Sequence, residues 1–299
     1  FEGCSFGFRP GRNAHQALDH VQAALKAGRC EVYDADLASY FDTIGHTRLM
    51  QQLERRIADR SVLHLIRLWL QCPVVEEDDQ GRRRTTRLRQ GTPQGGVISP
   101  LLANIYLHDF DRAFHEPGGP AQFANARLVR YADDFVVLAR WMGPRLVAWL
   151  ERMLEQDLGL TVNRTKTRVV RMSGVGVRLD FLGFTLRYDR DLRGRPWRYL
   201  QVEPSRKAEA RLREKLRGLT SASTKTSLPD TVAAVNTLLR GWTAYFRYGY
   251  PRRVFRALTY YLQVRFRCFL RNRSQRRSRP FRQGESLYAG LQRYGLRYL

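Results

Sequence analysis

The sequence predicts an α+β domain followed by an all-α region. Residues 31–37 and 127–139 are rich in Val, Leu, Tyr and Phe, which is typical of buried strands, and helical patterns surround them. From Pro204 onward, helical patterns alone remain. At roughly 150 residues per domain, a chain of 299 residues allows about two domains. We place them at residues 1–200 and 201–299.

The first element we expect is an amphipathic helix. Asn13 can serve as its N-cap, Leu18 and Val21 belong to its apolar face, and Gly28 ends it. A strand follows at 31–37 and ends in carboxylates, which are poor strand formers. Helices are then expected near 47–58 and 61–71, and a polar hairpin or loop at 76–87.

A longer helix is expected to start at Ser99 and Pro100, with Ser as N-cap and Pro as the first helical residue. Residues 127–139 then give two apolar strands around an Ala-Asp-Asp turn, which predicts a β-hairpin. Pro144 opens an amphipathic helix that ends at Gly159. Further strands are expected at 167–172, 180–187 and 199–203.

The second domain is expected to be built from helices at about 205–218, 230–246 and 252–272. Residues 220–228 are polar and small, and are the best candidate for a linker. Mixed elements followed by helices alone indicate one α+β domain with a helical appendage.

The charge of the chain favours a polyanionic partner. Fifty-two Lys and Arg against 28 Asp and Glu leave a net charge of +24, and the sequence pI is near 10.8. A basic protein gains affinity for nucleic acid because each neutralised phosphate releases counterions. A ribosome-associated or merely Arg-rich protein is the alternative on charge alone.

Other features argue against zinc and membranes. The four cysteines lie far apart without a CxxC pair, and the six histidines add no ligand spacing. No apolar run of 18 residues and no signal peptide appear, so we expect a soluble, unexported, cytoplasmic protein with no membrane partner. The chain begins at Phe1 in the middle of a pattern, and we expect it to be a fragment or a processed form.

Three carboxylates are the best candidates for chemistry. Asp133 and Asp134 stand at the tip of the predicted hairpin, and Asp36 ends another apolar strand. Adjacent carboxylates on a turn are often only solvated, but here the flanking strands should be buried, where a cation would offset like charges. Convergent carboxylates can hold two Mg²⁺ for nucleotidyl transfer. These residues therefore favour a polymerase or nuclease.

Five segments carry a resemblance to a known family. They are residues 6–12 (FGFRPGR), 36–42 (DLASYFD), 90–104 (QGTPQGGVISPLLAN), 131–134 (YADD) and 181–184 (FLGF). In this order they resemble the motifs of bacterial group II intron-encoded reverse transcriptases and maturases. The resemblance implies a right-hand polymerase palm with partial fingers, followed by an all-α thumb or maturase X domain. It also implies RNA, a DNA primer or target DNA, and dNTPs as partners, and a nucleoid or ribonucleoprotein location.

The resemblance also implies roles for single residues. Asp36, Asp133 and Asp134 would be catalytic and would bind two Mg²⁺. Nucleotide contacts are implied for Leu37, Phe41, Gln94, Gly95 and Lys166. In these roles, Phe41 is the steric gate that crowds a ribose 2′-OH, and Lys166 acts near the triphosphate, although it can also be read as an ordinary surface lysine.

The remaining basic residues are expected to contact RNA. Arg9 and Arg12 would meet phosphate or template, although an Arg in a Pro-Gly turn is often merely solvated. Residues 239–246 (LRGWTAYF) resemble the thumb or maturase X region of the family. Ten Arg and one acidic residue lie between Arg265 and Leu299, interleaved with aromatic residues, which suits structured RNA. Within this tail we favour Arg271, Arg273, Arg276, Arg277 and Arg279.

Two other functions stay open. Family members carry fingers motifs before the FGFRPGR segment, and only five residues precede Phe6 here, which favours a non-catalytic RNA-binding splicing factor. The three costly carboxylates count against that reading. A host-defence or CRISPR-associated reverse transcriptase is the third possibility. We take an RNA-directed DNA polymerase that also assists intron splicing and mobility as the prediction.

Overall fold

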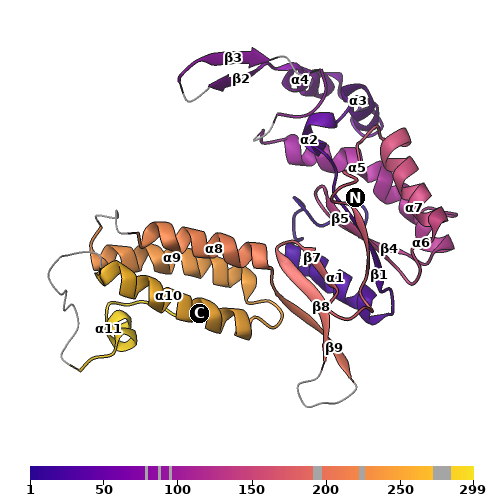
Figure 1. Cartoon of the computed structure of the whole chain (residues 1–299). Coiled ribbons are helices and arrows are strands. Elements are labelled where there is room, and N and C mark those ends of the chain that lie inside the picture. The colour runs from indigo at the N-terminus through magenta and orange to yellow at the C-terminus, as the bar shows by residue number, and fades with distance from the viewer. Residues whose placement is uncertain (78–79, 87–88, 94–95, 191–196, 222–225, 272–283) are drawn as a thin grey trace. The chain divides into compact units, whose positions relative to one another are not determined.

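The computed structural model describes residues 1–77, 80–86, 89–93, 96–190, 197–221, 226–271 and 284–299. The chain divides into two compact units, Phe1–Val177 and Arg178–Leu299. This division falls earlier than the predicted boundary at residue 200. The reason is that residues 178–190 and 198–204 pair in a sheet of their own instead of extending the sheet of the first unit. Each unit is described separately (Figure 1).

A four-stranded antiparallel sheet is the centre of the first unit. Its order is β4-β5-β1-β6, with bounds β4 (Arg127–Tyr131), β5 (Asp134–Ala139), β1 (Glu31–Ala35) and β6 (Arg168–Arg171). The predicted hairpin is confirmed as β4 and β5, and all of β5 after Asp134 is buried. Valine and phenylalanine suit such a buried strand because their side chains pack well on a pleated surface.

The first unit also contains helices. They are α1 (Ala14–Lys26), α2 (Tyr40–Thr43), α3 (His46–Glu54), α4 (Arg60–Gln71), α5 (Ser99–His115), α6 (Pro120–Phe123) and α7 (Pro144–Glu151), which continues as a π-helical turn, η1 (Arg152–Asp157). The predicted cap of α1 is confirmed, since Asn13 and Gln16 form a reciprocal capping box. The polar segment near 76–87 is a hairpin of β2 (Val74–Glu77) and β3 (Arg83–Thr86).

One predicted cap is wrong. Ser99 is the first residue of α5 instead of its N-cap, which is Ile98. The Ser99 hydroxyl donates to the Pro93 carbonyl 2.8 Å away, so it ties down the preceding loop and does not cap its own helix.

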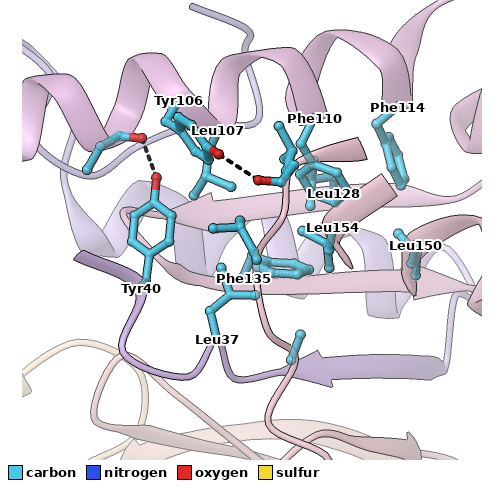
Figure 2. Close-up of a cluster of buried hydrophobic side chains, with 14 of the residues drawn as sticks. Leu37, Tyr40, Tyr106, Leu107, Phe110, Phe114, Leu128, Phe135, Leu150 and Leu154 are labelled. Atoms are coloured by element: carbon cyan, nitrogen blue, oxygen red, sulfur yellow. Dashed lines mark hydrogen bonds between the residues drawn. The ribbon is translucent and has the colours of Figure 1, made fainter. Parts of the chain in front are cut away.

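The core of the first unit lies between α5 and the sheet. Figure 2 shows Phe110, Phe135 and Leu154 packed together there, and the centroids of the first two rings are 5.3 Å apart. Two buried phenols are satisfied by backbone: Tyr40 donates to the carbonyl of Ala103, and Tyr106 to that of Leu158. The core therefore fixes the strand ends that carry the candidate catalytic residues.

The second unit combines a three-stranded antiparallel sheet with helices. The sheet order is β7-β8-β9, with bounds β7 (Arg178–Phe181), β8 (Phe184–Arg190) and β9 (Arg198–Pro204). The helices are α8 (Arg206–Leu219), α9 (Leu228–Phe246), α10 (Arg252–Arg271) and α11 (Leu287–Arg293). Their apolar faces share one core, which includes Leu216, Val235 and Leu262.

The single strand predicted at 180–187 is wrong. A tight turn at Leu182 and Gly183 divides it into β7 and β8, because both residues have positive φ, +51° and +80°. Within the described ranges, no helix has the length and the hydropathy to cross a membrane.

Candidate active site at the ends of β1 and β5

Two aspartates meet at one edge of the sheet. In the antiparallel pair of β1 and β5, Ala35 lies opposite Phe135, so Asp36 leaves β1 beside the residues that lead into β5. Asp133 occupies the turn between β4 and β5, next to Ala132, whose φ is +58°. The sheet thus brings together two carboxylates that are 97 positions apart in the sequence.

The surroundings of Asp133 disfavour the ionised form of its carboxyl. Burial raises the pKa of its carboxyl, the negative charge of Asp36 raises it further, and a backbone N–H and the Arg130 guanidinium act in the opposite direction. Such a pair of hard oxygen ligands suits Mg²⁺, whose charge would relieve the repulsion between them. The residues present therefore fit the metal.

The third carboxylate is placed differently. Asp134 is the first residue of β5, and its side chain is exposed. Across the part of the chain that the structure describes, no group of three His, Cys, Asp or Glu side chains is arranged to hold a metal. The geometry thus supports the pair of Asp36 and Asp133, and Asp134 as a further ligand stays a prediction.

A loop before β6 surrounds Asp36. Its Oδ2 accepts from Asn163 Nδ2 at 3.1 Å and lies 3.3 Å from Lys166 Nζ. Its backbone N–H donates to Thr167 Oγ1 at 3.2 Å. Lys166 therefore stands beside Asp36, and its expected role near a triphosphate stays a prediction. Asn163 and Thr167 received no role from the sequence, although they belong to the same short segment.

The segment of Phe41 is joined to the glycine-rich loop. The Thr92 N–H donates to the Phe41 carbonyl, and the Gly91 N–H to the Ile44 carbonyl, each at 2.7 Å. Gly91 has a φ of +86°, and a Cβ on it would lie 2.8 Å from the backbone of Asp42. The structure therefore fixes the candidate gate residue through Gly91, which the sequence did not single out. Gln94 and Gly95 lie outside the described residues.

Leu37 has a buried side chain. It belongs to the hydrophobic core in Figure 2 and pairs with Val162 in an isolated β-bridge. Because the side chain is in the core, a contact with a nucleotide at this position would have to use the backbone.

The FGFRPGR segment lies directly against the turn that carries Asp133. A Cβ on Gly7 would meet the nitrogen of Ala132 at 2.4 Å, so only glycine fits there without a shift of the turn. The two arginines of the segment are used locally. Arg9 donates to the carbonyls of Glu2 and Ser5, and the Arg12 guanidinium lies 5.2 Å from the centre of the Phe6 ring. Their contacts with template stay predictions.

The second unit joins two of the quoted motifs. Tyr245 Oη donates to the Leu182 carbonyl at 2.9 Å, and the Phe184 ring lies 5.1 Å from that of Phe246. The FLGF turn is thereby bound to the end of α9. In the basic tail, Arg271 is exposed at the end of α10. The other four candidates, Arg273, Arg276, Arg277 and Arg279, lie outside the described residues.

Comparisons with known proteins show the family of the chain. The family described as reverse transcriptase (RNA-dependent DNA polymerase) matches residues 1–186, and the group II intron maturase-specific domain matches residues 210–285. Protein YkfC of Escherichia coli K12 is 34% identical over 203 residues, which are 56% of this chain and 52% of that protein. The group II intron-encoded protein LtrA of Lactococcus lactis is 38% identical over 112 residues, 38% of this chain and 18% of LtrA.

A solved structure is also similar. Telomerase from Candida tropicalis, in complex with a fragment of telomeric RNA, matches with a TM-score of 0.49 and 12% identity over 91% of this chain and 48% of that chain. The chain spans about half of YkfC and less than a fifth of LtrA. The family match covers well over half of the sequence and includes both aspartates at the sheet edge. The chain belongs to the reverse transcriptases, among the group II intron-encoded reverse transcriptases and maturases.

Proposed function

We propose that this chain is the palm and thumb of an RNA-directed DNA polymerase of the group II intron type. In this proposal, a primer 3′-OH attacks the α-phosphate of a dNTP and pyrophosphate leaves. The observation that carries the proposal is the meeting of Asp36 and Asp133 at one sheet edge, with Lys166 Nζ 3.3 Å from Asp36. Both carboxylates stand where repulsion between them favours a cation.

The metal belongs to the proposal. Asp36 and Asp133 would hold Mg²⁺, and Asp134 is the candidate for a further ligand to a two-ion site. When bound, the ions supply positive charge at the attacking and leaving oxygens of the transfer.

The other residues position the substrate. Lys166 is exposed and close to Asp36, so its ammonium group is suited to bind a triphosphate and to give a proton to the leaving pyrophosphate. Phe41 is half-buried with its ring against that of Tyr40, and a ring in this position is suited to exclude a ribose 2′-OH. Positioning of this kind lowers the barrier because the reactants lose their freedom of motion before the reaction begins.

Intron RNA and a DNA primer or target are the proposed partners. The charge of +24 favours nucleic acid, and the arginine-rich tail after α10 is the candidate for contacts that assist splicing and mobility. A non-catalytic splicing factor is the competing function. It predicts tight RNA binding that is independent of Asp133 and no incorporation of dNTPs.

Primer extension tests the proposal. Wild-type protein is given an RNA template, a DNA primer, dNTPs and Mg²⁺, beside Asp133→Ala and the control Asp157→Ala, which removes an exposed carboxylate from η1. We expect wild type and Asp157→Ala to extend the primer and Asp133→Ala to lose extension, with RNA affinity unchanged within a few-fold. Tight RNA binding without extension by wild type would favour the splicing factor.

A further inference from the structure

A buried arginine beneath the Asp133 turn has no role in the proposed reaction. Arg130 in β4 and Asp111 in α5 form an ion pair whose side chains are both fully buried. Removing two charges from water is costly, and replacing a buried pair by apolar residues is often neutral or stabilising. A contribution to stability alone is therefore a weak reason for the pair, and its contacts point to a more specific one.

Every N–H group of the guanidinium has an acceptor. Nε and Nη2 donate to the two carboxylate oxygens of Asp111, and Nη2 also donates to Ser5 Oγ at 2.9 Å. Nη1 donates to Asn104 Oδ1 and to the Ala132 carbonyl, both at 2.8 Å. A guanidinium has five N–H donors in a rigid plane, and all of them are used here. The position of the Ala132 carbonyl is thus tied to that plane.

The Ala132 carbonyl belongs to the peptide group that enters Asp133. Ala132 itself has a φ of +58°, a conformation that is unfavourable for a residue with a side chain. Such a conformation persists only where the surroundings hold it in place. Arg130 supplies a charged hydrogen-bond donor at this peptide group, and charge-assisted bonds are the stronger kind.

Two other segments hold the same turn. Asn104 accepts from Arg130 and donates through Nδ2 to the Gly7 carbonyl at 2.8 Å. Gly7 in turn packs against the nitrogen of Ala132. The segment before Gly7 is fixed along β4, because the Phe6 N–H donates to the Arg130 carbonyl and the Arg130 N–H donates to the Cys4 carbonyl.

We propose that Arg130 is a positioning residue, which together with Asp111, Asn104 and Ser5 sets the orientation of the Ala132–Asp133 peptide group and so of the Asp133 carboxylate. The inference rests on the proposed role of Asp133 as a metal ligand. It assigns a purpose to Asn104 and Gly7, which belong to the quoted motifs and have no role in the proposed reaction. If a substitution away from the reacting atoms misplaces a catalytic group by about 1 Å, the rate can fall roughly 100-fold.

Variants that disturb the turn by different means test the proposal. Gly7→Ala pushes on Ala132 without changing Arg130, and Gly3→Ala is its matched control because no atom lies within 4 Å of a Cβ there. Arg130→Lys keeps a positive charge but has too few donors for all the acceptors. Ser5→Ala removes one acceptor and leaves the ion pair in place.

The readouts are Mn²⁺ binding to the protein by calorimetry, the kcat and KM of primer extension, and thermal unfolding. We expect Gly7→Ala and Arg130→Lys to lose at least tenfold in kcat and several-fold in Mn²⁺ affinity, with the KM for dNTP changed by less than about threefold. Ser5→Ala should show the same changes to a smaller extent, and Gly3→Ala should match wild type.

A purely structural ion pair would behave differently. Folded Gly7→Ala, Ser5→Ala and Arg130→Lys proteins with wild-type Mn²⁺ affinity and kcat would overturn the proposal. If Arg130→Lys does not fold, the other two variants decide the question by the same readouts. Failure of the proposed function has its own signature, namely wild-type protein that binds Mn²⁺ through Asp133 and extends no primer.

Discussion

Gly91→Ala should destabilise the first unit much more than an equivalent substitution at Gly28. The two glycines have nearly the same backbone conformation, with φ of +86° and +84°. They differ in their surroundings. A Cβ on Gly28 would meet no atom within 4 Å, whereas one on Gly91 would lie 2.8 Å from Asp42 Cα and 2.9 Å from the Phe41 carbonyl oxygen. The comparison therefore separates the effect of conformation from the effect of contact.

The magnitude follows from these contacts. A side chain in the left-handed region costs about 1–2 kcal/mol, partly offset by the lower entropy of the unfolded chain, about 0.4–1 kcal/mol. Both terms apply equally to the two variants and cancel in the comparison. Overpacking adds about 1–3 kcal/mol at Gly91 alone. Weakening the hydrogen bonds from the N–H groups of Gly91 and Thr92 adds about 1 kcal/mol for each. The expected difference is about 3–5 kcal/mol.

Urea unfolding of both variants beside wild type gives the difference in the free energy of unfolding. Gly28→Ala should lose about 1 kcal/mol, and Gly91→Ala about 3–5 kcal/mol more. Primer extension with dNTPs and rNTPs provides the second assay, because Gly91 lies against the backbone of Phe41 and Asp42. Selection against rNTPs should fall in Gly91→Ala and stay unchanged in Gly28→Ala. Equal losses of stability would refute the argument that contact with Asp42 requires glycine.

Three further outcomes are expected. Asp133→Asn should unfold at a higher temperature than wild type at pH 7 without metal, because the raised pKa of the Asp133 carboxyl means that its ionisation opposes folding. The advantage of the variant should disappear as the pH falls below the ordinary pKa of Asp. A gain in unfolding temperature that grows toward acid pH would contradict this. Tyr245→Phe should cost about 1 kcal/mol in urea unfolding through loss of the bond to the Leu182 carbonyl, and an unchanged midpoint would show that water replaces it. Charge reversal at Arg276 and Arg277 should weaken RNA binding and flatten its dependence on salt, and an unchanged slope would exclude them as phosphate contacts.

Asp36 and Asp133 could be predicted as a pair from the sequence because each one follows an apolar strand. A strand pattern shows where a chain leaves a sheet, and Asp36 and Asp133 can converge if both of their strands lie in one sheet. The register of β1 and β5 agrees with it. Asp134 shows the limit of that expectation, since Asp133 lies in the turn whereas Asp134 is the first residue of β5 and has an exposed side chain.

The hydrogen-bond network of Arg130 beneath the Asp133 turn could not be predicted from the sequence. Arg130 is separated from Asp111, Asn104 and Ser5 by 19, 26 and 125 positions, and no local pattern identifies such partners. An arginine in a strand ordinarily indicates a solvent-facing position, because burial of its charge requires partners that the sequence does not show. Leu182 was missed for a related reason. Its positive φ is unusual for a residue with a side chain, so the strand appeared to continue through it.

Gly7 and Gly91 explain why several separate motifs are needed for one site. Each glycine lies where the backbones of two motif segments approach too closely for a side chain, Gly7 at the turn of Asp133 and Gly91 at the segment of Phe41. Backbone contact at such distances makes the position of one segment depend directly on that of the other. Asp133 and the candidate gate residue Phe41 are consequently held by glycines that have no role in the proposed reaction. A substitution at either glycine should therefore act on the reaction through geometry, although neither residue contributes a functional group.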